Sequence, residues 1–91
     1  MKIALRIIVK GRVQGVGYRW FATQSAGLYG IKGTVRNLSN GNVEVVAHGD
    51  QNSVYEFVGK LKNGPSFAQV TDTEISDEEY DSSLREFKVI F

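Results

Sequence analysis

A glycine-rich stretch near the N-terminus holds the residues best suited to chemistry. It reads Gln14-Gly15-Val16-Gly17-Tyr18-Arg19 and runs from a segment of alternating apolar residues into one with helical spacing. Glycines allow several backbone N–H groups to converge, and the unpaired N–H groups in the first turn of a helix add partial positive charge. The sequence therefore predicts a concave anion site here, with phosphate as the best-suited ligand.

Arg19 would lie in the first turn of that helix, where the helix dipole disfavours a cation by about half a kcal/mol. A cation at such a position indicates that an anion shares the site. A guanidinium can also hold two phosphate oxygens at once, which an ammonium group cannot. The alternative is that Gly15 and Gly17 only make the turn while Arg19 points into solvent, and this stretch alone leaves both interpretations open.

Several classes of site are excluded by motif or composition. A Walker loop ends in Gly-Lys-Ser or Gly-Lys-Thr, and the dinucleotide fingerprint needs a third glycine where Trp20 stands. The chain has no cysteine and one histidine, which excludes thiolate metal sites and histidine clusters. We therefore expect no nucleotide, no cofactor and no metal ion.

Charge is unevenly distributed, although the formal net charge is only +1. Every charged residue before Glu44 is a lysine or an arginine, and most acids lie between Asp72 and Glu86. One interpretation is that the two parts neutralise each other across the fold, with residues 72–86 as a solvated acidic edge. A compatible interpretation is that an anion binds early in the chain, where no carboxylate repels it.

The elements that must hold the loop follow from hydrophobic periodicity. Alternation predicts a strand over residues 3–9, and helical spacing predicts a first helix from near Tyr18 to just before Gly30. The buried faces are expected to comprise Ile3, Leu5, Ile7 and Val9 in the strand, and Tyr18, Phe21, Ala22, Ser25 and Leu28 in the helix. Gly27 inside this helix indicates close packing or an early end.

A hairpin and a second helix should follow. Residues 31–37 and 42–47 are expected to form strands, joined by Asn40-Gly41, which favours a tight reversal with positive φ. The second helix should end at Asn63-Gly64-Pro65, and its buried stripe should comprise Val54, Phe57, Val58 and Leu61. Candidate caps are Asp50 and the capping box Ser53-Val54-Tyr55-Glu56.

Residues 67–75 and 85–91 look extended, the second with Phe87, Val89 and Phe91 on one face. The order βαββαβ plus a short terminal strand predicts a two-layer α+β sandwich of ferredoxin-like topology, with an antiparallel sheet and both helices on one face. We expect residues 1–91 to form one domain. The charged N-terminal segment fits neither a signal peptide nor a membrane span, so a cytoplasmic location is expected.

Two segments closely resemble the signatures of the acylphosphatase family. They are Gly11-Arg12-Val13-Gln14-Gly15-Val16-Gly17-Tyr18-Arg19 and Gly33-Thr34-Val35-Arg36-Asn37. The resemblance spans the whole chain, since further matches follow in order at Asn40-Gly41, Val43-Glu44, Gly49-Asp50, Gly64-Pro65 and Phe87-Lys88-Val89. The chain departs from many members at Thr34, where a large aromatic residue is common, and at Gly27. These two positions bear on local packing rather than on chemistry.

The resemblance implies a metal-independent enzyme that hydrolyses the carboxyl–phosphate bond of acyl phosphates to carboxylate and inorganic phosphate. It assigns phosphate binding to Arg19 with the loop amides of residues 14–19, and orientation of the attacking water to Asn37. The expected partner is a small-molecule acyl phosphate, without nucleic acid or membrane, and the expected state is a monomer.

This chemistry is compatible with the residues present. The leaving carboxylate is a stable anion and needs no protein acid, so the transition state chiefly requires charge and alignment. Asn37 can accept a hydrogen bond from water, although it is too weak a base to take the proton. The absence of Asp and Glu before Glu44 removes the carboxylates that would hold magnesium beside the loop.

Other interpretations were weighed. An RNA-recognition domain shares the element order but needs stacking aromatic residues on the strand at 42–47, which has none. A regulatory domain that has lost turnover is disfavoured because Arg19 and Asn37 are both present. Strand parity predicts that His48, Arg12 and Arg36 face solvent.

Overall fold

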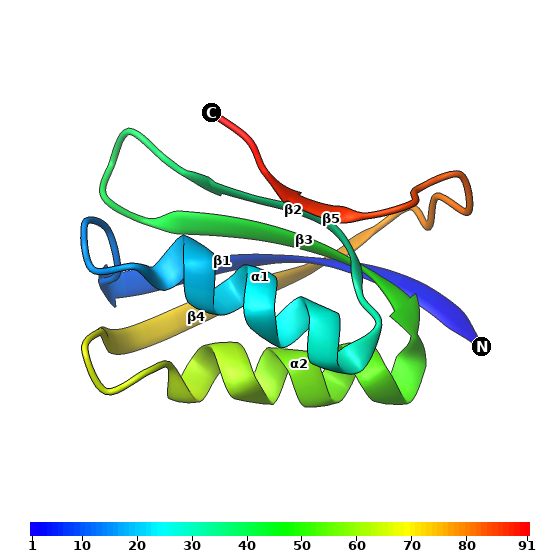
Figure 1. The fold of residues 1–91 in the computed structure, drawn as a ribbon, viewed down its shortest axis with the longest axis horizontal. Helices are drawn as coiled ribbons and strands as arrows, with labels where there is room; N and C mark the ends of the chain where they lie inside the picture. The colour runs from blue at the N-terminus through cyan, green and yellow to red at the C-terminus, as the bar shows by residue number, and fades with distance from the viewer.

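The computed structural model describes residues 1–91, which form five strands and two helices (Figure 1). The order is β1 (Lys2–Arg12), α1 (Tyr18–Tyr29), β2 (Lys32–Asn37), β3 (Val43–Asp50), α2 (Gln51–Asn63), β4 (Gln69–Glu78) and β5 (Phe87–Val89). This is the predicted order, with the last long strand starting later and running further than expected. Neither helix is long and apolar enough to cross a membrane.

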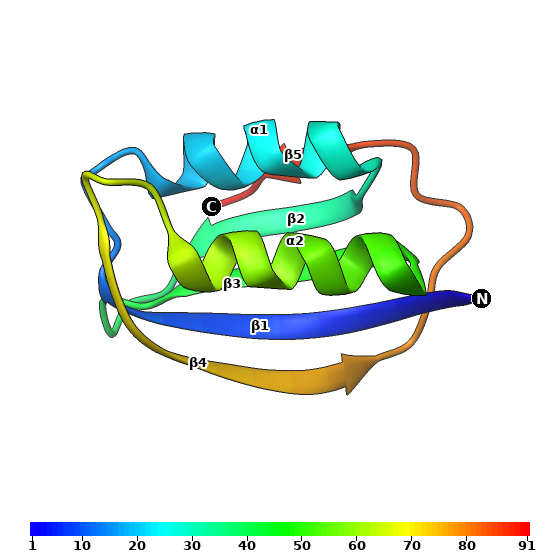
Figure 2. The same cartoon turned by 90° about the horizontal axis from the view of Figure 1, so that it is seen from below.

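The sheet has the strand order β4-β1-β3-β2-β5, and both helices cover the same face of it (Figure 2). The predicted two-layer α+β sandwich is therefore confirmed. The sheet is mixed rather than purely antiparallel, because β5 runs parallel to β2. Residues 79–86 cross one end of the sheet from the β4 edge to the opposite edge (Figure 2). β4 finishes at this end of the sheet and runs opposite to β2. A strand that starts at this end and pairs with β2 therefore runs in the same direction as β2.

The core lies between the helices and the sheet. The predicted stripe of α2 and the inward face of β3 are all buried, and they comprise Val54, Phe57, Val58, Leu61, Val43, Val45 and Ala47. In α1 the prediction was wrong for Leu28, which is 78% exposed, while Ala26 is buried instead. Leu28 lies about a third of a turn from the row formed by Tyr18, Ala22 and Ala26, so it points away from the core.

The start of α2 also differs from the prediction. The helix begins at Gln51, directly after β3, so Ser53 lies inside it and the predicted capping box is wrong. Asp50 occupies the N-cap position but its side chain makes no capping hydrogen bond. Its carboxylate instead forms an ion pair with Lys2, its cross-strand partner, at 3.2 Å. The pairing of β1 with β3 therefore determines the role of this side chain.

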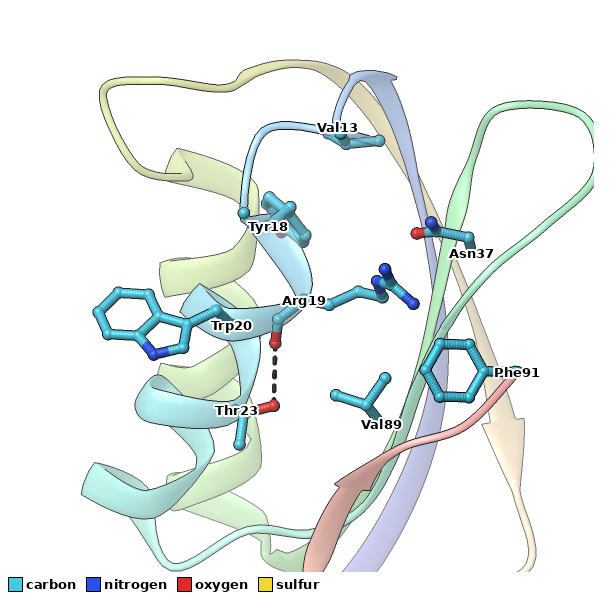
Figure 3. Close-up of a pocket in the computed structure, with 10 residues that line it drawn as sticks. Val13, Tyr18, Arg19, Trp20, Thr23, Asn37, Val89 and Phe91 are labelled. Carbon is cyan, nitrogen blue, oxygen red and sulfur yellow. Dashed lines mark hydrogen bonds between the residues drawn. The ribbon is translucent and has the colours of Figure 1, made fainter.

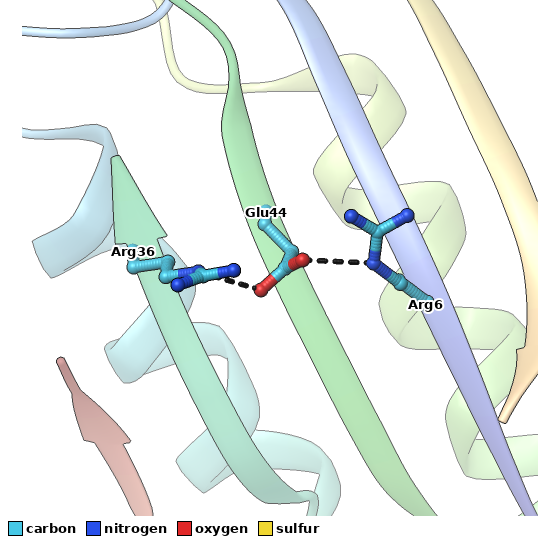
Figure 4. Close-up of polar contacts among 3 residues, drawn as sticks. All are labelled: Arg6, Arg36 and Glu44. Atoms are coloured by element: carbon cyan, nitrogen blue, oxygen red, sulfur yellow. Dashed lines mark hydrogen bonds and ion pairs between the residues drawn. The ribbon is translucent and has the colours of Figure 1, made fainter. Parts of the chain in front are cut away.

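Ion pairs join the basic first part of the chain to later acids. The pairs are Lys2–Asp50, Arg6–Glu44, Arg36–Glu44 and Lys10–Glu74. Neutralisation across the fold therefore holds for part of the charge, since Glu74 is the one acid of residues 72–86 that forms an ion pair. The carboxylate of Glu44 lies between Arg6 of β1 and Arg36 of β2, at 2.8 and 2.9 Å (Figure 4). Burial alone would raise the pKa of Glu44, but the two guanidinium hydrogen bonds outweigh it and lower the pKa.

His48 was expected to face solvent, and this prediction was wrong because only 7% of it is exposed. Its side chain lies on the sheet face away from the helices, where it is covered by residues 79–86, the segment that crosses the end of the sheet. The backbone N–H of Asp81 donates to His48 Nδ1 at 3.2 Å, and the ring of Tyr80 lies 5.9 Å away between centroids. Burial lowers the pKa of His48, although nearby Asp81 and Glu78 oppose the shift.

Two glycines give opposite predictions for substitution by alanine. Gly33 has φ 142°, and a Cβ there would lie 1.8 Å from the carbonyl oxygen of Val46. We expect Gly33→Ala to lower the free energy of unfolding by about 3 kcal/mol, from strain and displacement of β3. The sequence suggested close packing or an early helix end at Gly27, and both were wrong: a Cβ there meets nothing within 4 Å, and α1 continues to Tyr29. Gly27→Ala should raise the free energy of unfolding by ~1 kcal/mol.

Urea unfolding followed by circular dichroism would measure both variants. A Gly33→Ala protein as stable as the wild type would contradict the register of β2 against β3.

The environment of His48 predicts a pH dependence of stability. Because the folded state lowers the pKa of His48, the unfolded chain binds the proton more readily. The contribution of His48 to stability should be complete above its unfolded pKa of about 6.5 and decline as the pH falls below it. His48→Asn retains an acceptor for the Asp81 N–H but does not titrate in this range. The free energy of unfolding of this variant should therefore change less than that of the wild type between about pH 7 and about pH 5. Equal slopes for the two proteins would contradict the assignment.

Candidate active site

A cavity of about 470 Å³ opens where the β1–α1 loop, the first turns of α1, the end of β2 and the C-terminal segment meet (Figure 3). Its lining comprises Val13, Gly15, Gly17, Tyr18, Arg19, Trp20, Thr23, Asn37, Val89 and Phe91. Arg19 and Asn37 belong to motifs that lie apart in the sequence, yet they face the same cavity. In Figure 3 the guanidinium of Arg19 extends from α1 toward the amide of Asn37.

The loop before α1 presents free backbone donors. Gly15 and Gly17 have φ values of 72° and 82°, a region that glycine adopts without the strain of a side chain. Gly17 is the N-cap of α1 and provides no side-chain cap, and the first turn of α1 contains no acidic residue. None of the N–H groups of residues 15–20 donates a hydrogen bond within the protein. These donors are therefore available to an anion.

Arg19 keeps its charge free for the cavity. Its half-buried side chain forms no ion pair, whereas Arg6 and Arg36 both bind Glu44. No Asp or Glu side chain lines the cavity. The guanidinium carbon lies 5.3 Å from the centroid of the Phe91 ring, a favourable position for a cation beside an aromatic face. No acidic side chain therefore competes with an incoming anion for this guanidinium.

Asn37 offers an unused acceptor. It is the last residue of β2, and its Oδ1 atom is buried without a hydrogen-bond partner. A buried polar atom without a partner is uncommon, because it forfeits the hydrogen bonds that water would make. In Figure 3 the amide of Asn37 is directed into the cavity. A water molecule or a ligand placed there would supply the missing hydrogen bond.

The side chains of Gln14 and Val16 do not line the cavity, although both lie in the predicted phosphate-binding loop. Val16 packs against the core. Gln14 Nε2 donates to the carbonyl oxygens of Leu38 and Asn42, both at 2.7 Å. It therefore ties the loop to the hairpin directly after Asn37. Sequence reasoning missed this contact, because its partners are backbone atoms 24 and 28 residues away.

The side chain of Tyr18 fixes the start of α1. Its hydroxyl donates to the carbonyl oxygen of Leu61 at 2.7 Å, in the last turn of α2, where carbonyls lack helical partners. Burial raises the pKa of this phenol, so it remains a neutral donor. Tyr18 thus offers its backbone N–H to the cavity, while its hydroxyl joins the two helices.

The remaining cavity residues were not predicted as site residues. Val89 and Phe91 were placed on one face of an extended segment, without a role at the site. Only their position beside α1 in the folded sheet brings them to the cavity, so no local signal could have identified them.

Comparisons with known proteins agree with one another. The sequence model of the family described as "Acylphosphatase" matches residues 5–89. The chain is 46% identical over 91 residues to an acylphosphatase of Methanothrix thermoacetophila, with 100% of both chains covered. It is 38% identical over 86 residues to the acylphosphatase of Bacillus subtilis, with 94% of both chains covered. The crystal structure of acylphosphatase from Bacillus subtilis gives a TM-score of 0.92 at 37% identity, with 100% of both chains covered.

The contacts of Gln14 generate a prediction about the loop. Gln14→Ala removes both hydrogen bonds to the hairpin and frees the loop to move relative to Asn37. We expect the free energy of unfolding to fall by about 1 kcal/mol, and the affinity for inorganic phosphate to fall by roughly tenfold. Calorimetric titration with phosphate measures the second effect. Gln24→Ala is the matched control, because Gln24 is exposed on α1 and makes no hydrogen bond from its side chain. Equal phosphate affinity in the two variants would contradict a positioning role for Gln14.

Proposed function

Since this chain belongs to the acylphosphatase family, whose members hydrolyse acyl phosphates, we propose that it cleaves the carboxyl–phosphate bond of an acyl phosphate without a metal ion. The products are a carboxylate and inorganic phosphate. One observation carries the assignment of residues: an unpaired Arg19, a loop of free N–H groups and the unpartnered Oδ1 of Asn37 face a single cavity.

The phosphoryl group binds between Arg19 and the loop. The guanidinium holds two of its oxygens, and the backbone N–H groups from Gln14 to Arg19 surround the others. Charge that develops on these oxygens in the transition state then meets donors that are already in place. Such preorganised donors stabilise a transition state because they need not reorient during the reaction.

Asn37 positions the nucleophile. Its Oδ1 accepts a hydrogen bond from a water molecule, which directs a lone pair of that water toward phosphorus. The new bond forms between the water oxygen and phosphorus, and the bond from phosphorus to the carboxyl oxygen breaks. The water proton passes to a phosphoryl oxygen of the substrate, because an amide is too weak a base to accept it. The carboxylate leaves as a stable anion and needs no acid.

The donor set of the cavity supports catalysis without a metal. Magnesium in phosphoryl-transfer sites is held by carboxylates together with substrate oxygens. The cavity lining contains no Asp, Glu or His side chain, and it supplies positive charge through Arg19 instead. We further propose that the protein is a monomer and that it works in the cytoplasm. Light scattering would test the monomer, and cell fractionation would test the location.

The proposed activity is tested with benzoyl phosphate as substrate. We expect hydrolysis that persists in the presence of EDTA and that inorganic phosphate inhibits competitively. Simple alkyl phosphate monoesters should react poorly, because an alkoxide leaving group requires a proton from an acid. Loss of activity on chelation would overturn the metal-independent mechanism, and absence of acyl phosphate hydrolysis would overturn the proposed function.

Two variants separate the proposed roles of the site residues. Arg19→Gln should weaken the binding of substrate and of inorganic phosphate together, because it removes the only free cation of the cavity. Asn37→Ala should leave phosphate binding intact and lower kcat by on the order of 10²-fold or more, because only water orientation is lost. Steady-state kinetics and phosphate titration distinguish the two effects. Asn63→Ala, at the exposed end of α2, is the control. Near-normal turnover in Asn37→Ala would refute its assigned role.

A further inference from the structure

The free N–H groups of the β1–α1 loop need support from outside the loop. None of the N–H groups of residues 15–20 donates a hydrogen bond within the protein, so the backbone of the loop does not brace itself. Gln14 ties the start of the loop to the hairpin, and Val16 packs against the core. Gly17 has no side chain with which to make such a contact. Support at Gly17 can therefore come only from another part of the chain.

The ring of Phe67 covers Gly17. A Cβ built on Gly17 would lie 3.5 Å from Cε2 of Phe67, which is an ordinary van der Waals distance, and it would meet no other part of the fold within 4 Å. A Cβ on Gly15 would meet nothing within 4 Å, so Gly17 is the glycine of the loop that has a neighbour. Phe67 does not line the cavity. Its ring therefore supports the loop from outside the cavity.

The connection between α2 and β4 holds Phe67 in place. The N–H of Ala68 donates to the carbonyl oxygen of Pro65 at 3.1 Å, which closes a tight turn that contains Phe67. Ala68 packs against the core at one end of this turn. At the other end, a Cβ on Gly64 would lie 3.9 Å from the ring of Tyr18, so the connection also adjoins the start of α1. Figures 1 and 2 place this connection at the same end of the molecule as the β1–α1 loop.

Support at Gly17 bears on how tightly the loop binds an anion. Glycine has more backbone freedom than any other residue, and Gly17 is the N-cap of α1, with φ 82°. A loop that must be ordered when its ligand arrives binds less tightly, because ordering opposes binding. Donors that are already in position avoid this cost. A ring that restricts Gly17 would therefore raise the affinity of the loop for a phosphoryl group.

We propose that Phe67 is a positioning residue of the active site, whose ring holds Gly17 so that the N–H groups of the loop stay directed at the phosphoryl group. Phe67 does not touch the substrate and acts through the backbone of Gly17. Together with Gln14, it holds the loop from two different segments of the chain. This inference rests on the proposed function and adds a residue of the α2–β4 connection on which phosphoryl binding depends.

The first experiment compares steady-state kinetics of the wild type with those of Phe67→Ala, which removes the ring, and Phe67→Leu, which keeps an apolar side chain over Gly17. In Phe67→Ala the KM for benzoyl phosphate and the inhibition constant of inorganic phosphate should rise together by roughly tenfold, since the loop binds the phosphoryl group in both ligands. The value of kcat should fall by a smaller factor. A variant that was merely part unfolded would instead lose kcat at an unchanged KM. Phe67→Leu should recover most of the affinity.

Tyr55→Ala is the matched control. Tyr55 is an aromatic residue of similar exposure, 54% against 51% for Phe67. It lies in the first half of α2, whereas the last turn of that helix is the part joined to the start of α1, through Tyr18 and Leu61. This variant should leave the KM and the phosphate inhibition constant unchanged. Equal phosphate affinity in Phe67→Ala and Tyr55→Ala would overturn the role of Phe67.

The second experiment measures the order of the loop without turnover. NMR relaxation gives order parameters for backbone N–H groups, about 0.85 for rigid backbone and below about 0.6 for flexible backbone. In the phosphate-free protein, the order parameters of Gly15 and Gly17 should be lower in Phe67→Ala than in the wild type and unchanged in Tyr55→Ala. Saturating inorganic phosphate should restore them. Order parameters that are the same in all three proteins would overturn the inference.

The two experiments also separate this inference from the proposed function. Hydrolysis of benzoyl phosphate with a phosphate affinity that does not depend on Phe67 overturns the positioning role alone. Absence of hydrolysis in the wild type, together with phosphate binding that does depend on Phe67, overturns the proposed function and retains the positioning role. Absence of both hydrolysis and phosphate binding in the wild type overturns the two together.

Discussion

The site depends on one guanidinium that stays free of carboxylates in a protein where most neighbouring strands bring opposite charges together. The cross-strand arrangement makes this possible. Arg6 and Arg36 both bind Glu44 on the sheet face away from the helices. Arg19 lies on the helix side, where no acid lines the cavity. An acid beside Arg19 would neutralise its charge and compete with a phosphoryl group, so the separation of the two faces is what leaves the cavity positive.

The geometry of the site comes from connections between elements rather than from the loop alone. Gln14 ties the loop to the hairpin that follows Asn37, and Tyr18 ties the first turn of α1 to the last turn of α2. These hydrogen bonds fix the position of the free N–H groups of the loop relative to the amide of Asn37. A site that works by alignment needs such fixed connections, since small displacements of the reacting groups are costly.

Sequence reasoning succeeded where the determining contacts are local. The stripe of α2 and the positive φ at Gly41 follow from helical period and turn chemistry, and both are confirmed. The resemblance of two motifs indicated a common site for Arg19 and Asn37, and the structure brings them to one cavity. Their catalytic roles stay a prediction. Some failures were local: α2 begins before the predicted capping box, and Leu28 points away from the core. Others involve distant partners, since the burial of His48 requires the segment of residues 79–86. Likewise the parallel β5 and the cavity wall at Val89 depend on where that segment ends.

The order of the strands also determines how the two edges of the sheet meet other chains. An edge strand exposes unpaired N–H and C=O groups on which a foreign strand can add, a route to aggregation. β5 offers only three residues for such pairing. β4 offers ten, but it carries Asp72, Glu74, Asp77 and Glu78. Two molecules that approached through this edge would bring like charges together, so the acidic end of the chain protects the sheet from growing beyond its own five strands.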